Sequence, residues 1–202
     1  MSTLANGLTR YFTSNQLNRL RNAAVGIIGA GGLGSNVALM LVRSGVRHLA
    51  LIDHDHVDAS NLNRQAFLPK DIGKSKVNAL ACHLQDLEPN LSLEIHELLV
   101  TSENARQLLQ NYPIVVEAVD NADTKAMLYE TFAPSKALYV TASGMGGFGQ
   151  HEAPMITRHI RHNVIAVGDF ITTADNCNPP LAPRVMQAAA LQADAVLTHI
   201  LS

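Results

Sequence analysis

A glycine-rich junction between an apolar run and an amphipathic stretch constrains this chain more than any other feature. Residues 25–28 read Val-Gly-Ile-Ile, residues 29–34 read Gly-Ala-Gly-Gly-Leu-Gly, and a helical pattern follows to residue 44. This order predicts a buried strand, a tight turn and a helix whose first N–H groups can meet a phosphate. A tight turn without a ligand would read the same way. The candidate nucleotide-binding residues of the loop are Gly29, Gly31, Gly32 and Gly34.

Short apolar runs alternate with longer amphipathic stretches along the whole chain, which is typical of strand–helix units in a parallel sheet. We predict an α/β, Rossmann-like doubly wound fold: a mainly parallel sheet with helices on both faces, in one domain over residues 1–202. Strands are expected at residues 25–28, 48–52, 91–96, 114–119 and 138–141, with further candidates at 153–157 and 164–167. Helices are expected at residues 33–44, 74–87, 103–110, 123–132 and 183–201, after a lead-in helix at 14–22 within residues 1–22.

Acidic and polar side chains follow the second expected strand. Asp53 ends that strand, where this fold places an acid for ribose hydroxyls, and both NAD and ATP would use it. Asp55 would contact the nucleotide or accept hydrogen bonds from the following loop. A hydride-transfer enzyme has no obvious use for the polar cluster that comes next, whereas phosphate chemistry does. The cluster comprises Ser60, Asn61, Leu62, Asn63, Arg64 and Gln65.

Two cationic side chains near this cluster are candidates for the catalytic site. Arg64 offers a planar fork for phosphate oxygens, and Lys76, from the run Gly-Lys-Ser-Lys at residues 73–76, offers a compact charge. Together they could clamp a triphosphate. The alternative is a solvated basic loop ahead of a helix.

The fourth expected strand runs into Asp120 and Asn121. Ligands in open parallel sheets lie beyond the carboxyl ends of the strands where the strand order reverses, here between the first and fourth strands. We therefore predict that Asp120 holds Mg²⁺ through a carboxylate oxygen, with the metal joined mainly to substrate phosphates. The alternative is a helix-capping acid, a role that suits Asp123 better.

Histidines and cysteines give weaker signals. His54 and His56 flank the acids without a recognisable zinc spacing, and two cysteines cannot build a disulfide framework or a four-cysteine zinc site. Cys82 falls in an apolar helical pattern and is expected to be buried. Cys177 lies in a loop composition.

Charge and hydropathy exclude several classes of partner. Fifteen Lys and Arg against seventeen Asp and Glu give a net charge of -2, so no global field attracts nucleic acid or an anionic membrane. The start lacks a signal-peptide layout, and no apolar run approaches the ~18 residues of a membrane span. We expect a cytoplasmic protein.

As a set, these motifs resemble the ThiF/MoeB/HesA superfamily, the bacterial relatives of ubiquitin-activating enzymes. The resemblance runs from about Arg10 to the end and includes Leu-Ala-Pro-Arg at residues 181–184. The short length and the glycine-rich segment at residues 142–149 look most like the compact ThiF branch linked to thiamine biosynthesis.

The resemblance implies that a glycine carboxylate at the C-terminus of a ubiquitin-like sulfur carrier, ThiS-like, attacks the α-phosphate of MgATP. It implies a homodimer and the following contacts to ATP or its metal: Gly32, Asp53, Ser60, Asn61, Leu62, Asn63, Arg64, Lys76, Asp120 and Asn121. Adenylation of a molybdopterin-type carrier, an NAD-dependent oxidoreductase and a catalytically idle docking module remain open alternatives.

The chain departs from the family at three places. The paired Cys-x-x-Cys motifs are missing, so no structural zinc is expected. Thr13 stands where the family has an arginine that reaches a neighbouring subunit's ATP, and Arg10, Arg19 or Arg21 could substitute. Cys177 stands six residues before Pro183 where the usual spacing is eight, which favours an inert thiol over covalent sulfur transfer.

Overall fold

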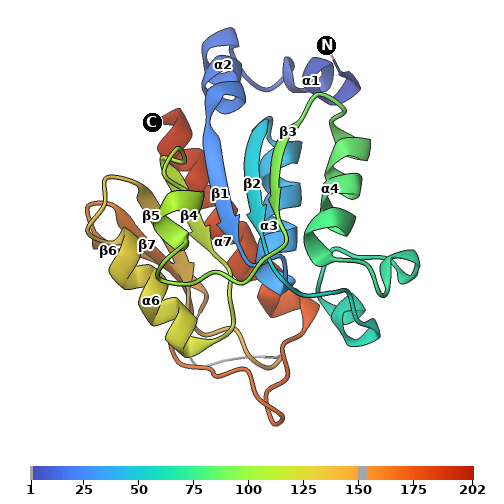
Figure 1. Ribbon diagram of the computed structural model, residues 1–202. Coiled ribbons are helices and arrows are strands. Elements are labelled where there is room, and N and C mark those ends of the chain that lie inside the picture. The colour runs from blue at the N-terminus through green and yellow to red at the C-terminus, as the bar shows by residue number, and fades with distance from the viewer. Residues whose placement is uncertain (1, 150–153) are drawn as a thin grey trace.

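A computed structural model describes residues 2–149 and 154–202 of the chain. Within these residues seven strands form one sheet in the order β3-β2-β1-β4-β5-β7-β6 (Figure 1). The pair of β6 and β7 is antiparallel and the other pairs are parallel, which confirms the Rossmann-like α/β prediction. The strands are β1 (Ala24–Ile28), β2 (His48–Ile52), β3 (Ser92–His96), β4 (Ile114–Glu117), β5 (Leu138–Ala142), β6 (Ile156–Arg161) and β7 (Val164–Gly168).

Helices cover both faces of the sheet because β1, β2, β4, β5 and β7 present apolar side chains on both sides. One core cluster joins the sheet to α3, α4 and α7, and a second joins the opposite face to α5 and α6. The helices are α1 (Thr3–Leu8), α2 (Ser14–Asn22), α3 (Gly32–Arg43), α4 (Lys76–Leu87), α5 (Ala105–Leu108), α6 (Ala122–Phe132) and α7 (Ala182–Leu201), with 3₁₀ turns η1 (Ala59–Asn63) and η2 (Pro69–Asp71).

Several helices and strands differ from those predicted by the hydrophobic pattern of the sequence. Helix α1 was missed because it is short, and Ser2 caps it by accepting a hydrogen bond from the Ala5 N–H. Strand β6 begins at Ile156 rather than at residue 153, which lies outside the described residues. It is an edge strand with mainly exposed side chains, so it carries no apolar alternation.

The fourth strand ends at Glu117, two residues before the predicted end. The Val119 N–H turns to donate to Glu117 Oε1 at 2.8 Å, which takes the chain out of the sheet. Helix α4 begins at Lys76 instead of residue 74, and α5 is shorter than predicted.

Cys82 is exposed, so the prediction of a buried thiol was wrong. The buried face of α4 follows Val77, Leu80, Ala81 and Leu84, a stripe of i, i+3, i+4 and i+7. Cys82 lies two positions after Leu80, which turns it about 200° away from that residue on the helix. Periodicity marked the segment as amphipathic, but Cys82 lies off its buried stripe.

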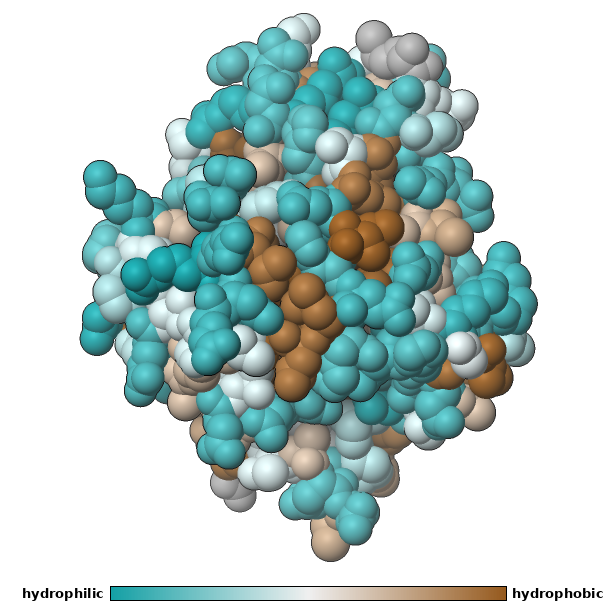
Figure 2. All heavy atoms as spheres, viewed as in Figure 1, coloured by the Kyte–Doolittle hydropathy of each residue, from teal (hydrophilic) through white to brown (hydrophobic). Residues whose placement is uncertain are grey.

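The surface is mainly hydrophilic on the face seen in Figure 2, with apolar side chains gathered near its centre. No helix within residues 2–149 and 154–202 is both long and apolar enough to cross a membrane. Buried apolar side chains form two core clusters around the sheet.

The strand order reverses between β1 and β4. At this switch point the glycine loop, which follows β1, packs against the residues that follow β4. Gly29 has φ +95°, and a Cβ on it would lie 2.6 Å from the Ala118 carbonyl oxygen. A Cβ on Gly34 would lie 1.8 Å from the Gly29 carbonyl oxygen. Both glycines are required by close backbone approach, and the approach brings the start of α3 beside the end of β4.

We predict that Gly34→Ala destabilises the fold by about 2 kcal/mol or more, because the added methyl meets backbone that cannot move without displacing the loop. The free energy of unfolding from urea titration measures the effect. Gly7→Ala is the matched control: Gly7 lies in α1 with nothing within 4 Å of its Cβ position, and alanine there should leave stability equal or slightly higher. A Gly34→Ala protein as stable as the parent would contradict the packing argument.

Candidate functional site

A cleft of about 910 Å³ opens at the carboxyl ends of the strands, at the switch point between β1 and β4. Its volume is that of a site for a nucleotide-sized ligand. Most of the residues predicted from the sequence line it. They are Gly29, Gly31, Gly32, Asp53, Asp55, Asn61, Arg64, Gln65, Lys76, Asp120 and Asn121.

Four predicted residues lie outside the cleft lining. Gly34 packs against the glycine loop, and Leu62 packs against the core. The Ser60 N–H donates to Asp58 Oδ1 at 2.8 Å, and Asn63 Nδ2 donates to the Pro180 carbonyl at 3.2 Å. In this structure these residues shape the loop around the cleft.

Asp53 joins the glycine loop to the end of β2. Its Oδ2 accepts a hydrogen bond from the Ala30 N–H at 2.6 Å, and its Oδ1 accepts one from the Asp55 N–H at 2.8 Å. The carboxylate is thus held at the mouth of the cleft by two backbone donors. An acid so placed can meet the ribose of a nucleotide whose phosphates approach the start of α3.

Lys76 and Asp55 form an ion pair on the cleft wall. Lys76 Nζ lies 2.7 Å from Asp55 Oδ2, and the lysine side chain is 9% exposed while that of Asp55 is 52% exposed. The hydrogen bond from Lys76 lowers the pKa of Asp55, and it outweighs burial, which acts in the opposite direction. Asp55 therefore orients the lysine. The sequence did not predict this contact.

The donor atoms of Asp53, His54 and Asp55 lie within 4.8 Å of one another. Both acids are already engaged, Asp53 by backbone N–H groups and Asp55 by Lys76. Exposed acidic groups of this kind are common without a metal, and the cluster adds a local negative charge at the rim of the cleft.

Arg64 follows the 3₁₀ turn η1 and extends over the start of α3. Asp58 caps this turn, and Asn61 Oδ1 accepts a hydrogen bond from the Asp58 N–H at 3.0 Å. Arg64 Nη1 donates to Asn63 Oδ1 at 2.7 Å and to the Ser60 carbonyl at 3.3 Å. A Cβ on Gly32 would lie 3.4 Å from Arg64 Cγ, so the arginine stem passes over the glycine loop. Its guanidinium retains donors for phosphate oxygens.

Asp120 and Asn121 line the cleft beyond the end of β4. Asp120 is exposed to the cleft, and no hydrogen bond or ion pair to its carboxylate is found among the described residues. One free carboxylate beside a phosphate site fits the way Mg²⁺ binds in proteins, with few protein ligands and several from substrate or water.

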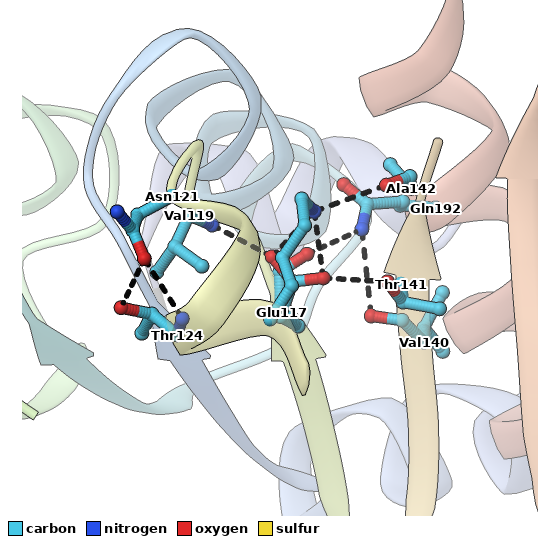
Figure 3. Close-up of polar contacts among 9 residues, drawn as sticks. Glu117, Val119, Asn121, Thr124, Val140, Thr141, Ala142 and Gln192 are labelled. Atoms are coloured by element: carbon cyan, nitrogen blue, oxygen red, sulfur yellow. Dashed lines mark hydrogen bonds and ion pairs between the residues drawn. The ribbon is translucent and has the colours of Figure 1, made fainter. Parts of the chain in front are cut away.

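Asn121 is the N-cap of α6, which settles the capping question raised by the sequence. Its Oδ1 accepts hydrogen bonds from the Thr124 N–H at 2.9 Å and the Thr124 hydroxyl at 3.1 Å (Figure 3). The cap is therefore neither Asp120 nor Asp123, and Asp123 lies in the first turn of the helix.

The buried acids, of which Glu117 and Asp169 are two, were not singled out from the sequence. Glu117 is fully buried at the end of β4 and pairs with Lys125, which lines the cleft. Asp169 forms a buried ion pair with Arg184 and holds the loop at Thr172. Burial would raise the pKa of Asp169, but hydrogen bonds from the loop and the Arg184 charge outweigh it and lower the pKa. A charged residue inside an apolar run was the available signal for Glu117.

Thr13 and Cys177, the two residues that depart from the family pattern, both have local roles in the chain. Thr13 caps α2, its Oγ1 accepting a hydrogen bond from the Gln16 N–H at 3.3 Å. Cys177 is exposed in a turn, where its N–H donates to Asp175 Oδ1 at 2.8 Å. It lies outside the cleft lining.

A glycine loop, an acid at the end of β2 and cationic side chains meet at the switch point of a parallel sheet, which is the arrangement of a Rossmann-like α/β protein. The model of the ThiF family matches residues 5–201, and the chain belongs to that family. The family assignment agrees with the resemblance seen in the motifs.

Three relatives are similar to this chain over part of their length. The adenylyltransferase and sulfurtransferase MOCS3 of Culex quinquefasciatus is 35% identical over 133 residues, 65% of this chain and 30% of that protein. The tRNA threonylcarbamoyladenosine dehydratase of Haemophilus influenzae is 36% identical over 143 residues, 70% of this chain and 55% of that protein. The sulfur carrier protein adenylyltransferase of Thermus thermophilus is 39% identical over 111 residues, 54% of this chain and 41% of that protein. The chain thus spans 30% to 55% of the length of these relatives.

A solved structure has the same fold. Escherichia coli tRNA N6-threonylcarbamoyladenosine dehydratase, TcdA, in complex with ATP, superposes with a TM-score of 0.86 at 22% identity, over 97% of this chain and 93% of that chain. At this level of identity the likeness establishes the fold alone.

The loop that carries Arg64 is anchored to α4 by a buried carboxylate. Asp71 Oδ2 accepts from the Leu68 N–H at 3.0 Å and lies 2.6 Å from His83 Nε2, and Lys74 Nζ donates to Oδ1 at 3.1 Å. Burial alone would raise the pKa of Asp71, but these hydrogen bonds outweigh it and lower the pKa to about 2.

Because the folded pKa of Asp71 is depressed, its contribution to stability is present above the unfolded value of 3.8 and is lost as the pH falls toward 2. We predict that Asp71→Asn loses ~2 kcal/mol at neutral pH and that this loss shrinks between pH 4 and pH 2. Urea unfolding of both proteins across this range measures it. Asp86→Asn, an exposed change on α4, is the control, and a loss independent of pH would refute the assignment.

Proposed function

We propose that this chain is an ATP-dependent adenylyltransferase that activates the C-terminal glycine carboxylate of a ubiquitin-like, ThiS-like sulfur carrier. The observation that carries the proposal is the joint placement of the glycine loop, Asp53, Arg64, Lys76 and Asp120 around one cleft. An oxidoreductase would use the first two features, but the cations and the free carboxylate serve no hydride transfer. They suit a triphosphate.

In the proposed reaction, a carboxylate oxygen of the carrier attacks the α-phosphorus of ATP. A new bond forms between that oxygen and phosphorus, and the bond from phosphorus to the bridging oxygen of pyrophosphate breaks. The products are the acyl adenylate and pyrophosphate. No general base is demanded, since the attacking carboxylate is already ionised. The task of the protein is to position the reactants and to neutralise charge.

Each cleft residue has a role that its geometry supports. The N–H groups at the start of α3 would donate hydrogen bonds to phosphate oxygens, and Asp53 would hold the ribose. Arg64 and Lys76 would offset the charge that builds on the phosphates, with Lys76 oriented by Asp55. Asp120 would hold Mg²⁺, which when bound neutralises phosphate charge and orients the triphosphate.

The proposed carrier follows from the names of two relatives and from the motif resemblance. Two relatives carry adenylyltransferase in their names, and one of these names a sulfur carrier protein. The thiamine pathway comes only from the resemblance to the compact ThiF branch, and a molybdopterin-type carrier would use the same chemistry. We further propose a homodimer, on the family resemblance alone, and a cytoplasmic location, as expected from the sequence.

A second candidate follows from the Haemophilus influenzae relative, whose name describes a dehydratase acting on threonylcarbamoyladenosine in tRNA. A threonylcarbamoyl group carries a free carboxylate, so activation by ATP could serve that substrate as well. The net charge of -2 weighs against it, because tRNA binding relies on cationic surface.

The deciding experiment is exchange of labelled pyrophosphate into ATP. Purified protein is incubated with MgATP and, in separate reactions, with ThiS-type and molybdopterin-type carriers ending in glycine, with the same carriers lacking that glycine, or with tRNA bearing threonylcarbamoyladenosine. We expect exchange that depends on the intact glycine terminus of one carrier. Exchange with tRNA alone would establish the second candidate, and no exchange with any of these would sink adenylation of a carrier.

Arg64→Ala and Asp120→Ala should each lower the exchange rate about 100-fold, because each removes a charged group placed for the phosphates or their metal. Melting temperatures should stay near that of the parent, since both side chains lie at the cleft surface. Arg43→Ala and Asp86→Ala, two exposed changes on α3 and α4, are matched controls that should retain full activity. A parental rate from either cleft variant would remove that residue from the mechanism.

A further inference from the structure

A fully buried carboxylate lies beneath the loop that carries Asp120. Glu117 is the last residue of β4, and its side chain is 0% exposed. Lys125, near the start of α6, donates from Nζ to both carboxylate oxygens of Glu117 at 2.8 Å and to the Ala142 carbonyl at 3.0 Å. These contacts use all three donors of the ammonium. Lys125 therefore joins the end of β4, the end of β5 and the start of α6.

The same network fixes the backbone on both sides of Asp120. Glu117 Oε1 accepts from the Val119 N–H at 2.8 Å, and Asn121 caps α6 through Thr124. Figure 3 shows these two anchors side by side, with Glu117 directed toward Thr141 of β5 and Asn121 toward Thr124. Asp120 lies between them, with its own side chain directed to solvent in the cleft.

The anchors also connect to the glycine loop. The Ala118 N–H, next to Glu117, donates to the Ile28 carbonyl at 2.8 Å, and the Ala118 carbonyl lies against Gly29. Gln192 of α7 donates from Nε2 to the Glu117 carbonyl at 2.8 Å. A shift of Glu117 would thus change the distance between the glycine loop and Asp120.

We propose that Lys125 is a positioning residue for nucleotide binding: by tying Glu117 to β5 and α6, it holds Asp120 at the spacing from the glycine loop that a metal-bound triphosphate needs. The inference rests on the proposed function and adds a residue that acts through Asp120. Removing the ammonium would leave Glu117 as an uncompensated buried acid, which the surrounding backbone must move to satisfy. Residues that orient a metal ligand in this indirect way typically contribute about 10- to 100-fold to metal affinity.

The test is calorimetric binding of ATP with and without Mg²⁺ to the full chain. Lys125→Met keeps the aliphatic stem and removes the donors, and we expect it to bind free ATP as the parent does while losing about 10- to 100-fold of the affinity that Mg²⁺ adds. Lys125→Arg, which retains charge and donors, should recover part of that loss. Lys136→Met, an exposed change beyond α6, is the matched control and should bind like the parent.

A second comparison separates positioning from general loosening of the fold. In an Asp120→Ala background, Lys125→Met should have little further effect on the Mg²⁺-dependent gain, because two residues that act through one contact are not additive. Two results would overturn the inference. One is a Lys125→Met protein in which Mg²⁺ adds as much ATP affinity as in the parent. The other is a Lys125→Met change that, in the Asp120→Ala background, lowers this Mg²⁺-dependent affinity by as much as it does in the parent. A parent that binds no ATP would overturn the proposed function as well.

Should Lys125→Met fail to fold, Thr141→Val provides the same test with a milder change. Thr141 donates its hydroxyl to Glu117, so valine removes one anchor and leaves the ion pair in place. We expect Thr141→Val to lower the ATP affinity that Mg²⁺ adds, by less than Lys125→Met does. A Thr141→Val protein in which Mg²⁺ adds as much ATP affinity as in the parent would contradict the proposal that the hydrogen bonds of Glu117 position Asp120.

Discussion

The close approach of the glycine loop to the end of β4 is the constraint on which the rest of the site depends. Two backbone segments meet where a Cβ on Gly29 would be 2.6 Å from the Ala118 carbonyl oxygen. Only at this spacing do the N–H groups at the start of α3 and the carboxylate of Asp120 face one cleft. Parallel pairing of β1 with β4 brings the segments together, and the missing side chains let them touch.

Charge inside the molecule is arranged in local pairs. Asp55 pairs with Lys76, Glu117 with Lys125 and Asp169 with Arg184, and each pair ties a loop of the cleft to an element of the core. Asp55 is half exposed, whereas Glu117 and Asp169 are buried. A pair with a buried acid gives little net stability, but breaking it leaves a buried charge unpaired and disturbs the local geometry. Arg64 forms no ion pair within the described part of the chain. Lys76 and Lys125 also line the cleft but are both paired, so Arg64 is the described arginine or lysine of the lining whose charge is left for a ligand.

Structural features that are set by residues close together in the chain could be predicted from the sequence. The bounds predicted for β2 and α2 match the structure, because a short apolar run and a capped amphipathic segment are local signals. The edge strand β6 was misplaced because its exposed side chains carry no alternation. Cys82 was misjudged because a helical pattern identifies an amphipathic segment more firmly than the environment of each side chain in it.

The sequence by itself determined the fold class, the glycine loop and the list of polar residues that could serve a nucleotide, since each follows from spacing and residue type. Tertiary structure alone decided which of those residues share the cleft: it excluded Ser60, Leu62 and Asn63 from the lining and placed Asp55 against Lys76. It also revealed Glu117 and Lys125 as a link between three elements. Such partnerships depend on strand order and on distances across the sheet, and a linear pattern of residues does not encode either one locally.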